Sequence, residues 1–413
     1  MVDLAPPPPE QAATSPLGRA LARVRTRLRL PAVRREPVTV RFDRREAVRA
    51  VGLYLAIAAL GFAVLLLLSH HLHYSVEHVL HRWDSANYLS VAEHGYPHHL
   101  SYRPNGRPAW STLAFFPLYP GLIWLVHLTG LPFTWAAVAV SWAAAAVAAA
   151  GVHTLASSVS GRRAGYACVA LWACYPYAFA LWVPYSEACF SAVLIWALVA
   201  LLARRWLAAG VLTALAGTLR PTASVLVGVV VVTALRQLVR ERRWRWQGKP
   251  VVCALVAPLG LVFSWLYLGA QVGRLDGWFQ AEKAWGQSFD FGRGTAHFLK
   301  RVATYREVDV RSIAVLALLL LTAVAVLALV LDRTVPWVLI LALAGVWVLA
   351  VGTPGSPLSK PRFLLPFLPI ALLPMAVAVG GLPRLVRGAL YGSGALFAGM
   401  YAVGLLLRFR YSP

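Results

Sequence analysis

Charged residues are scarce in this sequence. They make up 13% of the 413 residues, whereas 59% of the residues are hydrophobic. An ordinary soluble domain is about half apolar and about a quarter charged. The shortage of charge excludes water as the main solvent of the folded chain and predicts an integral membrane protein.

Acidic residues are scarcer than basic ones. The chain has 16 Asp and Glu residues against 39 Lys and Arg residues, which gives a formal net charge of +23. A nucleic-acid-binding protein would gather its basic residues on a soluble face with interleaved aromatics. Here the arginines lie between apolar runs, as the positive-inside rule predicts for cytoplasmic loops. We therefore expect membrane lipids, and no nucleic acid, among the partners.

Cysteine is rare, and the amino terminus lacks an apolar leader. The four cysteines lie within or beside apolar runs without zinc-type or redox-type spacing, which indicates small core residues. The first residues are Pro-rich and then strongly basic, unlike a secretory signal. The sequence predicts a basic, partly disordered cytoplasmic tail over residues 1–46 and a transmembrane domain over residues 47–413.

Apolar runs define an all-α architecture. About eleven runs are suited to cross a hydrocarbon core of about 30 Å at about 1.5 Å per residue. They span residues 48–68, 135–155, 164–183, 188–203, 207–219, 223–235, 251–268, 313–331, 335–351, 362–379 and 389–407. The segment 115–128 is rich in Pro and aromatic residues, and we expect it to be re-entrant or interfacial.

The order of the spans predicts which polar segments share a membrane face. With the amino terminus inside and the basic separators cytoplasmic, the loops 69–112 and 271–310 are external. The turns 184–187, 220–221 and 352–362 lie on the same side, and the last helix leaves Arg408 and Arg410 there too. We expect a multi-pass plasma-membrane protein with an extracellular active site.

The first external loop contains the densest polar motif, from Arg82 to Pro97. Read as a helix, it places Asp84, Asn87, Tyr88 and Val91 on one face. A carboxylate in partly dry aromatic surroundings can act as a general base or hold a metal ion. Alternatively, Asp84 caps a helix that begins at Ser85. Spacing alone leaves both interpretations open.

Metal ligands are not clearly patterned in this loop. Glu93 and four nearby histidines match no closed zinc ligand set; the histidines are His81, His94, His98 and His99. The motif establishes no cofactor. A divalent cation, Mg²⁺ or Mn²⁺, held by Asp84 together with a substrate phosphate is compatible with it.

Four further charges stand at the ends of apolar runs, namely Glu187, Arg220, Lys360 and Arg362. A charge inside the membrane costs about 2.5 to 3.5 kcal/mol on insertion scales, so it usually faces a cavity or a partner. The cations could clamp a phosphate group. Snorkelling of Arg220 and interfacial anchoring by Lys360 and Arg362 are the alternatives.

The second external loop alternates aromatic residues with amides over residues 277–287, including Gln280 and Trp285. Such a surface can stack on sugar rings and hydrogen-bond their hydroxyl groups. An aromatic belt at the headgroup level is the alternative.

Several motifs resemble the phosphatidylinositol-glycan class V family, that is, GPI mannosyltransferase 2 and its bacterial branch. The matching residues follow the expected order along the chain: Arg82-Trp83-Asp84 through Tyr88, Ala92-Glu93-His94-Gly95-Tyr96-Pro97, Phe115-Phe116-Pro117-Leu118-Tyr119-Pro120, Tyr175-Pro176, Pro184-Tyr185-Ser186-Glu187, Leu219-Arg220-Pro221-Thr222, Phe279-Gln280 and Trp285-Gly286. The similarity covers roughly residues 48–286.

The resemblance implies a GT-C-type glycosyltransferase. Such an enzyme transfers mannose from a polyprenyl-phosphate donor to a lipid-linked or surface glycan or protein acceptor on the external face. The family's catalytic acid maps onto Asp84. The substrate-binding residues implied or proposed with it are Trp83, Tyr88, Glu93, Tyr119, Glu187, Arg220, Gln280, Trp285, Lys360 and Arg362.

A transporter or lipid flippase would share the many helices and the buried charges. Such proteins usually show internal repeats or paired broken helices that meet near the membrane midplane. The sequence shows no such repeat. A non-catalytic assembly protein would leave Trp83 and Asp84 unexplained.

Overall fold

The computed structural model describes residues 38–241, 248–286, 288–304, 310–332, 335–354 and 357–408. Within these ranges the chain is helical and contains no strand, apart from one isolated bridge between Tyr102 and Pro108. Most of the expected tail over residues 1–46 lies outside the described residues, as does Arg410. The expected all-α fold class is confirmed.

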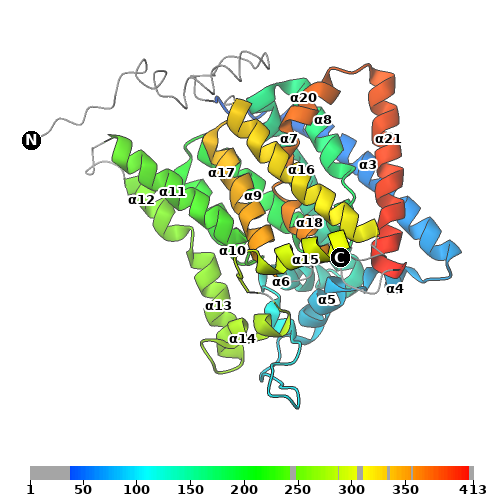
Figure 1. The fold of residues 1–413 in the computed structure, drawn as a ribbon, viewed down its shortest axis with the longest axis vertical. Helices are drawn as coiled ribbons and strands as arrows, with labels where there is room; N and C mark the ends of the chain where they lie inside the picture. Colours follow the sequence, from blue (N-terminus) through cyan, green and yellow to red (C-terminus); the bar gives the residue numbers. More distant parts are fainter. Residues whose placement is uncertain are drawn as a thin grey trace, which may run out of the picture.

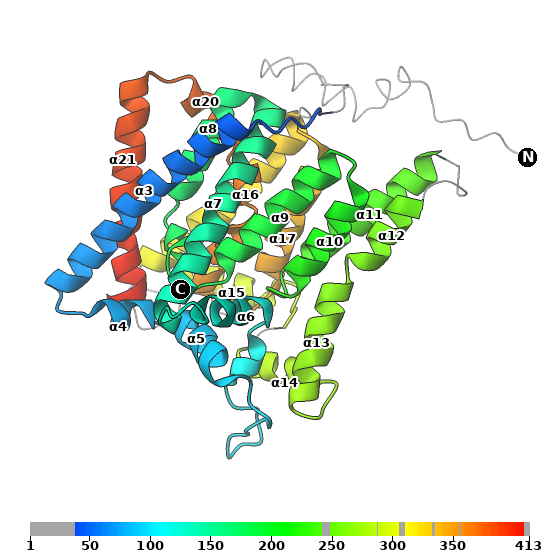
Figure 2. The same cartoon turned by 180° about the vertical axis from the view of Figure 1, so that it is seen from behind.

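Among the described residues, five helical segments are long and apolar enough to cross a membrane, one of which, Gly248–Gln271, joins two helices, and five shorter apolar helices accompany them. Figures 1 and 2 show the main helices as one bundle, with α3 crossing it at a tilt. The bundle helices are α3 (Arg44–His71), α7 (Phe133–Ser160), α8 (Arg162–Ala173), α9 (Glu187–Leu202), α10 (Trp206–Gly217), α11 (Ala223–Glu241), α12 (Gly248–Val256), α13 (Leu259–Gln271), α16 (Val310–Asp332), α17 (Trp337–Gly352), α20 (Leu373–Gly380) and α21 (Arg384–Val403).

Shorter helices gather toward one end of the bundle (Figures 1 and 2). They are α4 (Val76–Leu80), α5 (Asp84–His94), α6 (Leu118–His127), α14 (Gly277–Ala284) and α15 (Arg293–Thr304). The remaining short helical segments are η1 (Thr112–Ala114), η2 (Ala178–Leu181), η4 (Pro357–Ser359), α18 (Lys360–Leu364), α19 (Leu368–Ala371) and the π-helical η5 (Gly404–Arg408). The expected short segment after the first loop is α6, whose 10 residues reach only about 15 Å.

Prolines divide two apolar runs that the sequence presents as continuous. The run 164–183 is helical only to Ala173 and resumes as the short turn η2. The run 362–379 is split among α18, α19 and α20, because prolines at 361, 366, 369 and 374 interrupt the backbone hydrogen bonds of a single helix. The prediction of one continuous helix over each of these two runs is therefore wrong.

Small residues let the bundle helices approach closely. The buried face of α7 is rich in alanine, and α7 packs on α3, α8 and α9. Where α10 meets α13, a methyl group added at Gly260 would overlap the carbonyl oxygen of Ala214. Without a hydrophobic driving force between helices in lipid, such close van der Waals packing holds the bundle together.

Three contacts show that polar segments lie at both ends of the bundle. At the start of α3, Glu46 pairs with Arg162 at 3.5 Å and accepts a hydrogen bond from Tyr166 at 2.6 Å. At the opposite end, the Arg82 Nε donates to the carbonyl oxygen of Leu406 at 3.1 Å. The last helix therefore ends beside the loop 69–112. The order of the spans predicted that these two segments lie on the same side.

Candidate active site

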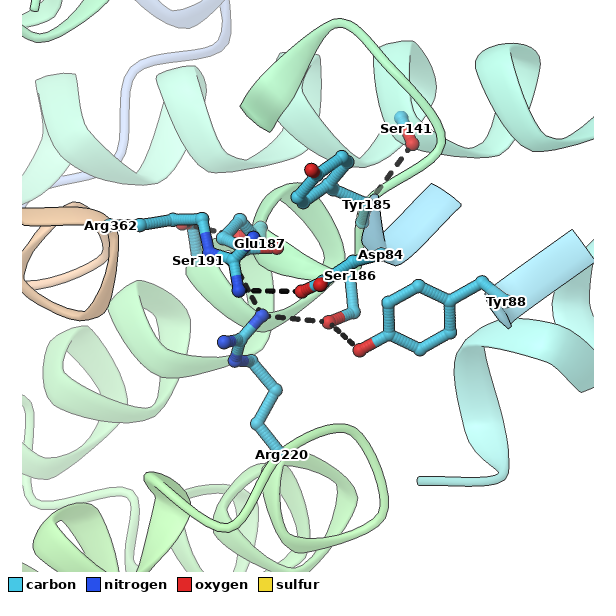
Figure 3. Close-up of polar contacts among 9 residues, drawn as sticks. All are labelled: Asp84, Tyr88, Ser141, Tyr185, Ser186, Glu187, Ser191, Arg220 and Arg362. Atoms are coloured by element: carbon cyan, nitrogen blue, oxygen red, sulfur yellow. Dashed lines mark hydrogen bonds and ion pairs between the residues drawn. The ribbon is translucent and has the colours of Figure 1, made fainter. Parts of the chain in front are cut away.

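Four charged side chains from four separate elements form an ionic cluster. Asp84 is the first residue of α5, Glu187 the first of α9, Arg220 lies between α10 and α11, and Arg362 lies in α18. The Arg362 Nη2 is 2.5 Å from Asp84 Oδ2, and its Nε is 2.8 Å from Glu187 Oε1. The Arg220 Nη1 is 2.7 Å from the same Glu187 oxygen. Figure 3 shows both guanidinium groups converging on the acids.

The solvent exposure of the four side chains increases from the interior of the cluster to its edge. The exposed fraction of the side chain is 0% for Glu187, 5% for Arg362, 10% for Arg220 and 14% for Asp84. Both acids stand at helix amino termini, where the helix dipole favours negative charge. The two acids and the two arginines balance in formal charge, which is what allows charges to be buried.

Neutral polar groups extend the cluster. Ser186 Oγ accepts a hydrogen bond from Arg220 Nη1 at 3.0 Å and lies 2.6 Å from the Tyr88 hydroxyl. The guanidinium carbon of Arg362 lies 4.9 Å from the centre of the Tyr185 ring, a cation–π contact. These contacts fix both arginines in place (Figure 3).

Trp83 sets the direction of α5. It has φ 59° and ψ −125°, a conformation that costs a bulky residue on the order of 1–3 kcal/mol. Its indole packs against the core beneath the guanidinium of Arg82, whose Cζ lies 4.8 Å from the ring centre. Trp83 occupies the N-cap position, so Asp84 begins the helix instead of capping one that starts at Ser85. The capping interpretation of Asp84 is wrong, because its carboxylate contacts Arg362.

A cavity of about 620 Å³ opens beside the ionic cluster. Asp84, Arg220 and Arg362 lie on its wall, and Tyr88 is next to them. Seven aromatic residues from η1, α13, α14, α18 and the residues that follow them also line the cavity: Phe115, Phe116, Trp265, Trp278, Phe279, Trp285 and Phe363. Five hydroxyl side chains line it as well: Thr222, Ser224, Ser288, Thr353 and Ser359. The cavity thus combines a few polar groups with an apolar wall, as small-molecule sites do.

The two predicted external loops are joined at the cavity. The indole nitrogen of Trp110 donates to Ala284 O at 3.0 Å, and that of Trp285 donates to Ser111 O at 3.3 Å. Their rings stack with centres 5.7 Å apart and an interplanar angle of 16°. Trp285 therefore lies on the cavity wall and not in a belt facing lipid.

Glu282 is a cavity residue that the sequence reasoning missed. It belongs to α14 and lines the cavity together with Lys283. Burial among aromatic side chains raises the pKa of Glu282 to about 8, with the charge of Asp84 adding to the shift and that of Arg220 opposing it. The available signal was its position in the aromatic stretch 277–287. Glu282 is the one acid in that stretch, and no basic residue stands three or four positions away to pair with it on a helix.

Other predicted site residues lie away from the cavity wall. Glu93 is exposed on α5, and the Gln280 amide donates to Asp276 Oδ2 at 2.7 Å. Tyr119 is fully buried beneath Tyr88 and bonds Ser141 Oγ at 2.8 Å. None of the three is among the residues that line the cavity, and only Tyr119 packs against a residue that does, Tyr88.

Lys360 is 1% exposed and does not face the cavity. Its Nζ donates to Ala350 O at 2.6 Å and to Thr353 O at 2.5 Å, at the carboxyl end of α17. A cation at this position offsets the helix dipole. Lys360 therefore neither anchors the chain at the membrane interface nor lines the cavity.

Arg220 and Arg362 are held inward by ion pairs, so the snorkelling and anchoring alternatives do not apply to them. Among the described residues, no three His, Cys, Asp or Glu side chains lie together in a way that could hold a metal ion. A divalent cation bound jointly by Asp84 and a substrate phosphate stays a prediction.

Comparison with known proteins gives one informative likeness. No protein-family model matches the sequence, and no curated protein matches it. The structure is similar to the crystal structure of ArnT from Cupriavidus metallidurans bound to undecaprenyl phosphate, with a TM-score of 0.51 and 15% identity. The match covers 86% of this chain and 77% of that chain. At this identity the likeness concerns the fold alone: the helical-bundle fold expected from the sequence is confirmed, and it is similar to that of ArnT.

Proposed function

We propose that this protein is a membrane glycosyltransferase whose donor is a sugar linked to a polyprenyl phosphate. The observation that carries the proposal is the ionic cluster of Asp84, Arg220 and Arg362 on the wall of an aromatic cavity of about 620 Å³. The fold that holds this cavity is shared with ArnT, whose crystal structure contains undecaprenyl phosphate. Both facts favour a polyprenyl-phosphate ligand.

The two arginines suit a phosphate group. A guanidinium has five N–H donors in a fixed plane, so each arginine keeps donors for a phosphate beyond those used in the ion pairs. Glu187 contacts both guanidinium groups and would hold them in register. Preorganised cations contribute most where charge develops in the transition state, here on the departing lipid phosphate.

Asp84 is the carboxylate best placed for the reaction. It is the most accessible acid of the cluster, and only its Oδ2 is paired with Arg362. We expect it to accept the proton of an acceptor hydroxyl, whose oxygen attacks the anomeric carbon and inverts its configuration. A Mg²⁺ or Mn²⁺ ion that bridges the other oxygen and the donor phosphate is compatible with this arrangement.

The family resemblance supplies the finer assignments. It points to phosphatidylinositol-glycan class V relatives, to mannose as the sugar, and to a lipid-linked or surface glycan or protein as the acceptor. Trp285 and the neighbouring aromatic wall would stack on a sugar ring. The extracellular side of the plasma membrane follows from the predicted topology.

Asp84→Asn tests the proposal directly. Membranes of a deletion strain, which contain the natural acceptors, are incubated with purified enzyme and radiolabelled undecaprenyl-phosphate mannose. Wild-type enzyme should move label into lipid, glycan or protein, and Asp84→Asn should lower this rate on the order of 10²–10⁴-fold, because the amide cannot accept the proton.

Glu77→Gln serves as the control, because Glu77 is an exposed acid on α4 and is not among the residues that line the cavity. Its rate should match that of the wild type. Turnover by Asp84→Asn at the wild-type rate would contradict the role of Asp84. In sealed liposomes, passage of intact donor across the bilayer without sugar transfer would instead identify a flippase.

A further inference from the structure

A second carboxyl group lines the cavity in surroundings unlike those of Asp84. Asp84 is ion-paired with Arg362, whereas Glu282 has no hydrogen bond or ion pair from its side chain to any part of the chain that the structure describes. Two acids in one site with contrasting environments are the usual arrangement for a base and an acid. In the proposed transfer, a base accepts the proton of the acceptor hydroxyl, and an acid can protonate the departing phosphate.

The departing phosphate oxygen is the place where negative charge develops. Arg220 and Arg362 can donate to the phosphate, but each is also paired with an acid of the cluster, and Lys283, the remaining cation among the described residues that line the cavity, is exposed. A protonated carboxyl group beside the departing oxygen would stabilise the developing charge. Transfer of its proton as the bond breaks spreads that charge between the phosphate and the carboxylate, which lowers the barrier.

We propose that Glu282 is the general acid that protonates the departing polyprenyl phosphate. The proposal rests on the proposed function and extends it. The acceptor O–H bond breaks and its proton moves to Asp84, while the acceptor oxygen bonds to the anomeric carbon. The bond from that carbon to the phosphate oxygen breaks with its electron pair on the oxygen, which takes the proton of Glu282. Exchange with water then restores both carboxyl groups.

The groups that face Glu282 are compatible with this role. Asp84 on α5 and Arg220 before α11 act on it in opposite directions, and Arg362 lies deeper in the cluster. On α14 itself, Lys283 also lines the cavity. Of the elements packed against α14, η1 has no titratable side chain and α13 has only Tyr267, whose ring packs on Tyr96 and Phe263. With a pKa of about 8, Glu282 holds its proton at neutral pH.

Glu282→Gln tests the proposal through the pH dependence of kcat. Transfer from radiolabelled undecaprenyl-phosphate mannose into deletion-strain membranes is measured between about pH 5.5 and 9.5. Wild-type kcat should fall above about pH 8 as Glu282 loses its proton. Glu282→Gln should lower kcat on the order of 10²-fold and abolish the alkaline fall, because the amide neither donates a proton nor ionises. Glu282→Asp should restore an alkaline fall.

Asp276→Asn, at the N-cap of the same helix, is the matched control. Its carboxylate is exposed, and the bond to Arg274 lowers its pKa to about 2, so it stays ionised across the profile. Thermal unfolding in detergent checks that each variant is folded. An alkaline fall that persists in Glu282→Gln, or a change confined to KM, would overturn this proposal alone. No transfer by wild-type enzyme would overturn the proposed function as well.

Discussion

At the scale of single residues, the site depends on a shared acid. Glu187 Oε1 is approached by Arg220 at 2.7 Å and by Arg362 at 2.8 Å, and its side chain is completely buried. Removing one partner from a buried ion pair leaves an uncompensated charge, which is strongly destabilising. Each arginine therefore stabilises the cluster, and under the proposed function it would also bind the lipid phosphate.

Arg220→Ala and Arg220→Lys separate these two roles. We expect Arg220→Ala to lower kcat/KM for the lipid-phosphate donor by about 10²-fold, because one preorganised cation is lost. Arg220→Lys keeps the charge but loses the planar fork, so its value should lie between those of Arg220→Ala and the wild type. Steady-state transfer at varied donor concentration measures both.

Arg274→Ala is the control for the loss of a cation, since Arg274 pairs with Asp276 at the surface. It should leave kcat/KM unchanged. If Arg220→Ala has the wild-type dependence on donor concentration, Arg220 does not contact the phosphate.

At the scale of elements, the contact between α10 and α13 holds the cavity wall in place. Gly260 lies against Ala214, and Ser264 Oγ donates to the carbonyl oxygen of Gly217 at 3.1 Å. The same helix α13 contributes Trp265 to the cavity wall and packs against α14, which bears Glu282. The close approach of α10 and α13 therefore positions one side of the site.

Gly260→Ala should destabilise this contact. The added methyl group overlaps the carbonyl oxygen of Ala214, and overpacking of this kind costs about 1–3 kcal/mol. The midpoint of thermal unfolding in detergent should fall. Gly228→Ala, in α11, places its methyl group in open space and should not lower the midpoint. Equal midpoints for the two variants would show that α10 and α13 separate without cost.

At the scale of the whole molecule, the helices α5 and α14, which contribute acids to the site, lie toward one end of the bundle (Figure 1). At this end the first loop contacts η5, through the hydrogen bond from Arg82 to Leu406. Glu46, Arg162 and Tyr166 come together at the opposite end. From the positive-inside rule we predict that this second end faces the cytoplasm. The orientation in the membrane is therefore a property of the whole chain that can be tested apart from catalysis.

Single introduced cysteines report the orientation. Asn105→Cys lies in the first loop, and Arg205→Cys lies between α9 and α10; both positions are exposed. The natural cysteines are buried, apart from the half-buried Cys174, so background labelling should be low. A membrane-impermeant maleimide should label Asn105→Cys in intact cells and Arg205→Cys only after permeabilisation. The reverse pattern would place the site in the cytoplasm.

The sequence by itself determined the class of protein and the location of its key acid. Apolar runs and scarce charge suffice for a membrane bundle, because the hydrocarbon core demands apolar helices whatever their partners. The motif around Asp84 likewise stands out by composition. The expected helical face was right for Asp84 and Tyr88, since the three- and four-residue spacing is local.

Only the tertiary structure decided which distant charges meet. Asp84 and Arg362 are 278 residues apart, and no local pattern couples them. The structure also separated Arg362 from Lys360, two residues away, because the turn of α18 directs one to the acids and the other to the carbonyl groups of α17. The place of Glu282 in the cavity was likewise decided by the tertiary structure. Only the folded chain brings α14 and α5 to one cavity, where burial raises the pKa of Glu282 and Asp84 is paired with Arg362.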